Sequence, residues 1–417
     1  MATPSAELRN AASSDAANRL GRRFWTLATS SGLSNLADGA FKLALPLVAI
    51  RFTRSPGLVA GIELVRSLPW LLFALPAGAF VDRWDRRHTM LVANTVRATI
   101  LLVPAVALAM DGGSLLLLFV AAAVTGVAEV FYDTSAQSIL PSLVPAERLS
   151  RANGRLYAVE LGAQQFVGPP LAGVIVGVAL AAAFWVPSAM WVAALAVLFT
   201  LRGNFRPARS GATRTIRSDI AEGVRFVGHH RLLRTMAVMV GGINLATSAT
   251  FAVFVLYAVG DDSTLALTDT GFGLVMLASA AGSIVGSFVC ERIERAIGRA
   301  HTLTLSILGM AVMVGVAAVT SNVWIVVAGM VLGGFAVMLW NIPTVSFRQH
   351  VTPDHLLGRV NSTYRLLAWG TMPLGALLGG LVGQAFGLTA VFVVGAALVL
   401  ALLVPNLVIT DERLAAA

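Results

Sequence analysis

The chain has 417 residues, of which 57% are hydrophobic and only 12% are charged, whereas about 25% of residues are charged in a soluble domain. With a mean hydropathy of +0.80, this composition excludes an ordinary soluble protein and predicts an integral membrane protein. The net charge of +9 would suit a nucleic-acid partner, but the basic residues are spread over many loops rather than gathered on one face. We therefore expect no nucleic-acid binding.

Apolar stretches long enough to cross a bilayer, about 20 residues each, occur along the whole chain. They predict an all-α protein with twelve transmembrane helices that is embedded in the lipid bilayer. The predicted helices cover residues 24–50, 57–81, 89–110, 114–140, 153–179, 182–201, 232–259, 269–290, 301–320, 323–347, 357–385 and 387–409.

The distribution of arginines indicates the orientation in the membrane. Arg9, Arg19, Arg22 and Arg23 precede the first predicted helix, and the loop after every second helix carries several more arginines. Because positive residues collect on the cytoplasmic side, both termini are expected in the cytoplasm. The N-terminal residues lack the apolar region of a signal peptide. We expect a multi-pass protein of the cytoplasmic membrane.

One loop pattern occurs twice, 209 positions apart: a small residue, an acid four positions later, and two arginines. The first copy contains Gly78, Asp82, Arg83 and Arg86, and the second contains Ser287, Glu291, Arg292 and Arg295. Asn35 recurs as Asn244 at the same offset, and Arg151 recurs as Arg359 at an offset of 208. Repeats at one period indicate an internal duplication and hence two pseudo-symmetric six-helix bundles.

The duplication divides the chain into two bundles joined by a polar linker. The predicted parts are a cytoplasmic tail at 1–23, an N-terminal bundle at 24–201, a cytoplasmic linker at 202–231, a C-terminal bundle at 232–410 and a second cytoplasmic tail at 411–417. Within the linker, residues 215–226 are expected to form an amphipathic helix on the membrane surface.

The first predicted helix carries Asp38 and Lys42 near its middle, one helical turn apart. Ionised groups at that depth are costly unless they are paired or hydrated. Two interpretations stay open: Asp38 and Lys42 neutralise each other and only pack, or Asp38 faces a water-filled cavity and carries a proton. We favour the second, because the repeat places Thr247 at the equivalent position, so the scaffold does not need an acid there.

Further ionisable residues lie inside the predicted helices of the first half. Arg97, Glu129, Asp133 and Glu160 could form either a structural network or a path for protons, and we group the three acids with Asp38 as proton-coupling residues. The second half has almost no ionisable residue inside its helices and is expected to supply a ligand-binding wall. The predicted cavity residues are Lys42, Arg97, Asn244, Thr247, Trp340 and Asn341.

Two motifs carry a resemblance to a known family. The loop Gly78-x-x-x-Asp82-Arg83-x-x-Arg86-Arg87 resembles the signature between helices 2 and 3 of the major facilitator superfamily. The fifth predicted helix contains Gly168-Pro169-x-x-Ala172-Gly173, which is similar to a motif of the antiporter branch, although Gln164 stands where that motif carries glycine. Its prolines also predict a kink. The stretch 131–153 resembles the macrolide-efflux and siderophore-exporter group of drug:proton antiporters.

The resemblance implies alternating access, in which two bundles rock about a central site. It also implies a gate: Asp82 would contact the region 359–361 when the cytoplasmic side is closed, and Glu291 would contact 151–153 by pseudo-symmetry. The residues expected to form this gate are Gly78, Asp82, Arg83, Arg86, Arg87, Glu291, Arg292, Arg151 and Arg359.

The source of energy follows from the motifs that are present. No P-loop motif occurs, which argues against ATP hydrolysis, and the six histidines lie at helix ends or in loops, so we expect neither a metal site nor a cofactor. Carboxylates buried in the membrane remain as carriers, because burial favours the protonated form.

We therefore predict a monomeric bacterial transporter, not an enzyme, that contributes to drug resistance. It would export small amphipathic or hydrophobic molecules, such as drugs or macrolides, in exchange for protons. Two alternatives stay open: export of an endogenous siderophore-like metabolite, and a non-transporting receptor or scaffold built on a transporter fold.

Overall fold

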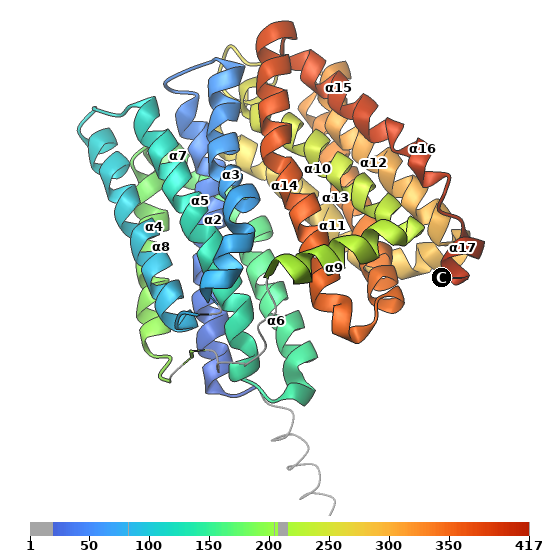
Figure 1. Cartoon of the computed structure of the whole chain (residues 1–417). Helices are drawn as coiled ribbons and strands as arrows, with labels where there is room; N and C mark the ends of the chain where they lie inside the picture. The colour runs from blue at the N-terminus through green and yellow to red at the C-terminus, as the bar shows by residue number, and fades with distance from the viewer. Residues whose placement is uncertain (1–19, 82, 204, 207–215, 417) are drawn as a thin grey trace, which may run out of the picture.

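The computed structural model describes residues 20–81, 83–203, 205–206 and 216–416. Within these ranges the chain is almost entirely helical, and Figure 1 shows the helices in two groups. The first group contains α2 (Arg22–Ala49), α3 (Pro56–Val81), α4 (Arg86–Ala109), α5 (Leu115–Ile139), α6 (Leu149–Leu161), η3 (Gly162–Val167), α7 (Gly168–Val178) and α8 (Ala182–Phe199). The second contains α10 (Arg231–Ala258), α11 (Asp269–Ile297), α12 (Arg299–Val319), α13 (Val323–Val351), α14 (Asp354–Phe386) and α15 (Leu388–Ala401).

Short helices connect or extend these elements. They are η1 (Leu140–Ser142), η2 (Ala146–Arg148), α9 (Ile216–His229), α16 (Leu403–Asn406) and α17 (Asp411–Ala415). We call the side on which α2 begins and α8 ends the terminal side, and the side on which α2 ends and α3 begins the opposite side. Because consecutive long helices are antiparallel, α14 begins on the terminal side and α11 begins on the opposite side.

The helices agree with the segments predicted from hydropathy. All twelve predicted segments are helical, and most of their ends differ from the prediction by a few residues. In the described ranges, eleven helices are both long and apolar enough to cross a membrane. α2 is also long enough, with 28 residues, but it buries polar side chains such as Ser34, Asn35 and Asp38. The predicted all-α membrane fold is confirmed.

The fifth predicted segment is interrupted, as its prolines predict. A π-helical turn at Gly162–Val167 separates α6 from α7, and prolines occupy the first turn of α7. Proline has no N–H group and cannot continue the hydrogen-bond ladder. The wide turn packs against α2: a Cβ added to Gly39 would clash with the backbone of Gln164. The break therefore occurs where two helices touch at backbone distance.

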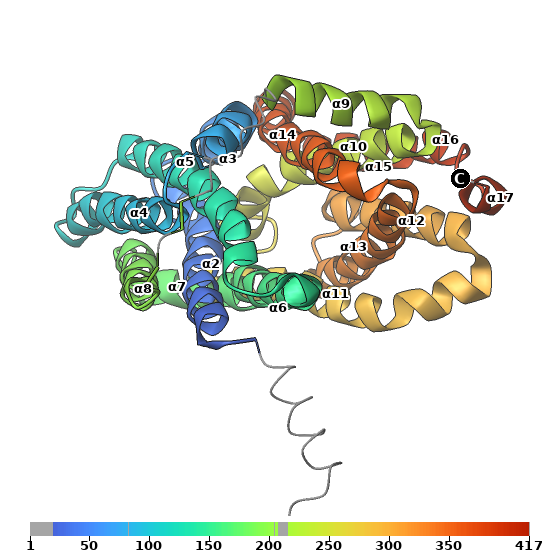
Figure 2. The same ribbon diagram turned by 60° about the horizontal axis from the view of Figure 1, so that its bottom comes forward.

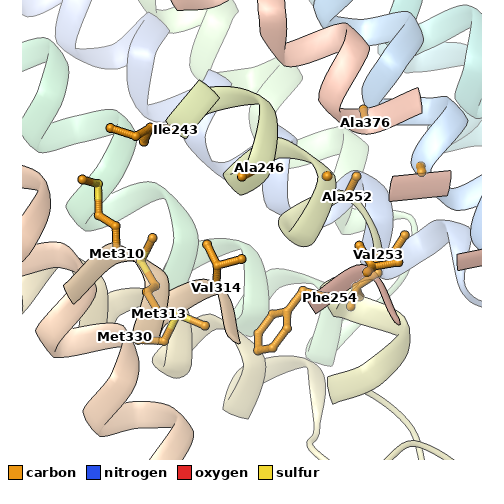
Figure 3. Packing of buried hydrophobic residues seen from close by; sticks show 14 of the residues in the cluster. Ile243, Ala246, Ala252, Val253, Phe254, Met310, Met313, Val314, Met330 and Ala376 are labelled. Atoms are coloured by element: carbon orange, nitrogen blue, oxygen red, sulfur yellow. The ribbon is translucent and has the colours of Figure 1, made fainter. Parts of the chain in front are cut away.

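The two groups of helices are built around different cores. In the second group, Phe254 of α10 packs against Phe272 and Phe392, with ring centroids 5.9 and 6.2 Å apart. Figure 3 shows methionines, including Met310 and Met330, in the same cluster. In the first group, buried charged and polar side chains interrupt the apolar core, and Arg97 is fully buried among them.

The two groups meet along two seams. α3 packs against α14, and α7 packs against α11. Figure 2 shows the first group on one side and the second group on the other, with α3 next to α14. A central cavity lies between the seams.

The linker contains a helix, α9, where an amphipathic helix was predicted. This helix packs against the second group of helices. α9 packs on the first turns of α14. The Glu222 carboxylate lies 2.6 Å from Arg359 Nη1, and a Cβ added to Gly223 would lie 2.7 Å from the carbonyl oxygen of Arg359. Because glycine at this position lets the helices touch, α9 belongs to the second group.

Candidate functional site

The central cavity has a volume of about 350 Å³ and is lined by both groups of helices. The first group contributes the polar or charged side chains of Lys42, Glu63, Gln164 and Gln165 together with apolar residues, including Leu43, Leu45, Val59 and Ile62. The second group contributes mainly apolar side chains, including Phe251, Phe272, Met276, Met330 and Met372, together with Thr247 and Ser248. A mainly apolar cavity with charged side chains on one wall suits an amphipathic ligand.

Lys42 is the exposed cation of this cavity. Its side chain is solvent-accessible although α2 lies in the interior of the fold, and it makes no ion pair with any residue of the described ranges. Glu63 of α3 lines the same cavity, where it pairs with an arginine behind the wall. The cavity therefore offers one ammonium group and one neutralised carboxylate.

Asp38 does not pair with Lys42, and it does not line this cavity. Its Oδ2 atom lies 3.2 Å from Nη1 of Arg97 on α4. The side chain of Arg97 is fully buried, and the same Nη1 donates to the Ser34 hydroxyl at 3.2 Å. The expected pair of Asp38 and Lys42 is therefore wrong, and so is the expected place of Asp38 on the cavity: the carboxylate is held by an arginine of a neighbouring helix.

Arg97 is enclosed by aromatic rings. Its guanidinium carbon lies 5.1 Å from the ring centre of Tyr132 and 5.6 Å from that of Trp191. Two of its nitrogens, Nε and Nη2, are buried without a hydrogen-bond partner. The cation is thus stabilised by one carboxylate and two π faces, and Arg97 lies away from the cavity wall on which it was expected.

A second ion-pair cluster joins α3 to α5. Arg66 Nη2 lies 2.7 Å from Glu63 Oε1, and Arg66 Nη1 lies 3.2 Å from Glu129 Oε2. The Arg66 side chain is only 9% exposed, so it is satisfied mainly by the two acids. Glu129 is therefore paired with Arg66 and not with Arg97, and the cluster reaches the cavity through Glu63.

Asp133 of α5 and Glu160 of α6 are the remaining two predicted proton-coupling acids. Both carboxyl groups lie within electrostatic range of Arg365 of α14, although in the described part of the chain neither forms a salt bridge with it. Arg365 also donates to Gln137 of α5, and its guanidinium carbon lies 4.4 Å from the ring centre of Trp369. Arg365 thus belongs to the second group of helices, whereas Gln137, Asp133 and Glu160 belong to the first group.

The polar residues expected in the second half have separate places. Thr247 lines the cavity and hydrogen-bonds to the Ile243 carbonyl oxygen at 2.8 Å. Asn244 donates to the Ala368 carbonyl oxygen at 2.7 Å and so ties α10 to α14. Trp340 is buried in the apolar core, and Asn341 is exposed. Of the six predicted cavity residues, only Lys42 and Thr247 line the central cavity.

The loop signature lies at the terminal end of the first group. Arg87 donates to the carbonyl oxygens of Leu198 and Phe199, at 3.3 and 3.0 Å, and so caps the end of α8. Arg83 is exposed, and Arg86 is half-buried. A Cβ added to Gly78 would meet no atom within 4 Å. Asp82 lies outside the residues that the structure describes.

Two of the other gate residues form ion pairs on their own helix or with the linker. Glu291 is 79% exposed and pairs with Arg295 on its own helix at 2.8 Å. Arg292 and Arg151 are exposed, and Arg359 pairs with Glu222 of the linker.

The opposite side is closed by contacts between the two groups. Arg51 Nη2 lies 2.6 Å from Asp269 Oδ2, and Ser55 Oγ donates to Gln384 Oε1 at 2.8 Å. A Cβ added to Gly173 of the fifth-helix motif would lie 2.6 Å from the carbonyl oxygen of Asp269. The motif predicted from sequence thus lies at a seam where the backbones of the two groups touch, and only glycine fits there.

Sequence reasoning missed several residues of the cavity. The Gln164–Gln165 pair reaches it because the π turn changes the rotation of the fifth helix. The three methionines of the wall, Met276, Met330 and Met372, come from three different helices. A pair of glutamines beside two prolines in an apolar helix is a signal that could have identified the first set. Nothing in the sequence distinguishes the methionines from core residues.

Comparison with known proteins supports a transport function. A family model described as "Transmembrane secretion effector" matches residues 17–415. The chain is similar to the multidrug efflux pump Tap of Mycobacterium tuberculosis (strain ATCC 25618 / H37Rv), with 29% identity over 388 residues and 88% of each chain covered. Tap of Mycolicibacterium fortuitum is 25% identical over 371 residues, which cover 85% of this chain and 88% of that protein.

Solved structures share the fold. A bacterial homologue of the iron transporter ferroportin in an inward-facing state has a TM-score of 0.70 and 20% identity, with 94% of this chain and 99% of that chain covered. The nucleoside transporter NupG has a TM-score of 0.71 and 13% identity, with 92% and 99% covered. The chain therefore belongs to the transmembrane secretion effector family of the major facilitator superfamily and is a multi-pass membrane transporter of small molecules.

Proposed function

We propose that this transporter exports small amphipathic or hydrophobic molecules across the cytoplasmic membrane by proton antiport. The observation that carries the proposal is the central cavity, in which Lys42 and Glu63 face a wall of phenylalanine and methionine side chains. Such a wall accepts ligands of varied shape, because methionine side chains are flexible and polarisable. The relatives named multidrug efflux pump support the same substrate class.

The conformation supports alternating access with the terminal side in the cytoplasm. The seams on the opposite side are closed by Arg51 and Asp269 and by the contact at Gly173, whereas Glu291 on the terminal side is 79% exposed and pairs with Arg295 of its own helix. With both termini in the cytoplasm, this arrangement corresponds to an inward-facing state that is ready to accept a molecule from the cytoplasm or the inner leaflet.

Asp38 is the proposed proton carrier. A buried ion pair is costly to break, because one charge is then left without a partner in a medium of low dielectric constant. Here the remaining charge would be Arg97, which keeps the π faces of Tyr132 and Trp191 and the Ser34 hydroxyl. This environment lowers the cost of neutralising Asp38 and therefore suits a carboxylate that binds and releases a proton during each cycle.

Arg365 is the proposed connection between protonation and movement. It belongs to the second group but interacts with Asp133 and Glu160 of the first. Negative charge on these acids attracts Arg365 and draws α14 toward α5, whereas protonation removes the attraction. Protons bound in the first half would thereby change the position of the second half.

The alternatives make different demands on the same residues. An exporter of an anionic siderophore-like metabolite would use Lys42 as its main anchor, because Arg66 and Arg97 are already paired with acids. A receptor or scaffold would not need a proton carrier and would tolerate the loss of Asp38.

The test uses inside-out vesicles with an acidic interior and a dye that reports proton release. Macrolides, other lipophilic drugs and siderophores are added in turn to wild type, Asp38→Asn and the control Glu412→Gln, which neutralises an exposed acid outside the membrane helices. We expect lipophilic drugs to dissipate the gradient with wild type and Glu412→Gln but not with Asp38→Asn. Equal responses from all three would remove Asp38 as the carrier, and a response to siderophores alone would favour the metabolite exporter.

A further inference from the structure

A second apolar cavity lies on the outer surface of the first group, away from the central one. It has a volume of about 970 Å³ and runs between α4 and α5. Its walls are aliphatic and include Val92 and Val96 of α4 and Ala123 and Val127 of α5. Figures 1 and 2 show α4 at the outer edge of the molecule, next to α5. We call this cavity the α4–α5 groove.

The groove has a polar end on the terminal side. Arg83 and His88 line this end, together with Arg206 from the linker and Trp84, which is 53% exposed. Asp85 also lies there, but its two carboxylate oxygens accept the backbone N–H groups of His88 and Phe205, at 2.9 and 3.0 Å. The end of the groove therefore carries two arginines, and the Asp85 carboxylate beside them caps α4 and holds the linker.

This distribution matches the two parts of a phospholipid. An aliphatic groove on a membrane-facing surface takes an acyl chain, arginines bind phosphate oxygens well, and an exposed tryptophan at the membrane boundary suits the headgroup level. Charge complementarity selects an anionic lipid over a zwitterionic one, because each basic residue near a membrane surface favours anionic lipids.

We propose that the α4–α5 groove is a binding site for one anionic glycerophospholipid of the leaflet on the terminal side. The acyl chain lies between α4 and α5, and the phosphate lies beside Arg83 and Arg206. The site is separate from the substrate cavity, and it places a lipid against the loop that carries the superfamily signature. The inference depends on membrane insertion of the fold and not on the proposed proton antiport.

The test measures retained lipid by native mass spectrometry of the purified full-length protein in detergent. The probes are phosphatidylglycerol and phosphatidylcholine with identical chains. Wild type is expected to retain phosphatidylglycerol in preference to phosphatidylcholine, and the variant Arg83→Gln/Arg206→Gln is expected to lose about fivefold of that preference for each arginine. The matched control Arg22→Gln/Arg23→Gln removes the same charge from the exposed start of α2, outside the groove, and is expected to keep the preference.

A second variant tests the chain-binding part. Ala123→Trp fills the groove from the α5 wall and is expected to reduce retention of both lipids, while inorganic phosphate at equal concentration is not expected to displace phosphatidylglycerol. Quenching by brominated phosphatidylglycerol should also be stronger in wild type than in Trp84→Phe. Equal retention of the two lipids by wild type, or an unchanged preference in the double arginine variant, would overturn the proposal.

Discussion

The two halves of the molecule share one helix arrangement but bury different side chains. At the offset of 209 positions that relates them, Asp38 corresponds to Thr247 and Arg97 corresponds to Ser306. The second ion-pair cluster is replaced in the same way: Glu63, Arg66 and Glu129 correspond to Phe272, Val275 and Met338. Since the second half folds without these charges, the charges of the first half are not required by the architecture. The comparison therefore identifies them as candidates for function.

The sharpest test of this comparison removes the buried cation of the first half. Arg97→Met leaves Asp38 buried without its ion-pair partner, so we expect a loss of about 3–5 kcal/mol in unfolding free energy. The measurement is thermal or denaturant unfolding of the purified protein in detergent. The double variant Asp38→Asn/Arg97→Met makes this region neutral, as it is in the second half, and should recover most of the loss. Equal stability of the single and double variants would contradict the pairing.

The converse change adds a charge to the second half. Thr247→Asp places a carboxylate where the repeat has no arginine, because Ser306 stands in the position that corresponds to Arg97. We expect a loss of about 2.5–3.5 kcal/mol, which is the typical cost of an aspartate in the middle of a membrane helix. Thr247→Asn is the control of similar size, and unfolding in detergent is again the measurement. If the two variants were equally stable, the cavity would hydrate an acid in either half.

A smaller effect is expected from forcing the halves apart on the opposite side. Gly173→Val introduces a side chain where a Cβ would lie 2.6 Å from the Asp269 carbonyl oxygen, and overpacking of this kind costs about 1–3 kcal/mol. Cysteines at positions 55 and 384, in a background where Cys290 is replaced by alanine, report closure by cross-linking. We expect the yield to fall in Gly173→Val.

The control for this assay is Gly154→Val on α6, where an added Cβ meets no atom within 4 Å. It is expected to leave the cross-linking yield unchanged. A yield that falls equally in both variants would show that the fall does not come from the seam between the halves.

The smallest effect is expected from the ion pair on the opposite side. Arg51 is 41% exposed in its pair with Asp269, and exposed ion pairs contribute about 0–1 kcal/mol. Arg51→Gln should therefore change the same cross-linking equilibrium by less than about fivefold. An effect as large as that of Gly173→Val would mean that the salt bridge, and not the backbone contact, holds the seam together.

The helices could be predicted because length and hydropathy alone define a membrane span. α2 through α15 lie close to the predicted segments, and the repeat, read from Gly78 and Glu291, indicated two halves of equivalent design. The break in the fifth helix followed from Pro169 and its neighbour. These predictions depend only on local sequence, which is why they agree with the structure.

The partners of the charged residues could not be predicted in the same way. Spacing placed Asp38 next to Lys42, but the rotation of α2 directs the two side chains apart, to Arg97 and to the cavity. The linker helix was predicted from its amphipathic pattern, whereas its docking on α14 through Gly223 depends on tertiary contacts. Which side chain faces which neighbour is decided by helix rotation, and a single sequence carries little information about it.

The seams on the opposite side have a further consequence for the energy of the transport cycle. Where α7 meets α11, glycine backbone lies in the contact, as at Gly173 and Gly273. Because glycine has no side chain, separating these surfaces transfers little apolar area to a new environment. In the proposed antiport, one proton moving across a difference of one pH unit releases about 1.4 kcal/mol, which changes the ratio of two conformations about tenfold. A seam that costs little free energy to separate can thus be opened by a small driving force. Stronger packing there would keep the transporter in one orientation.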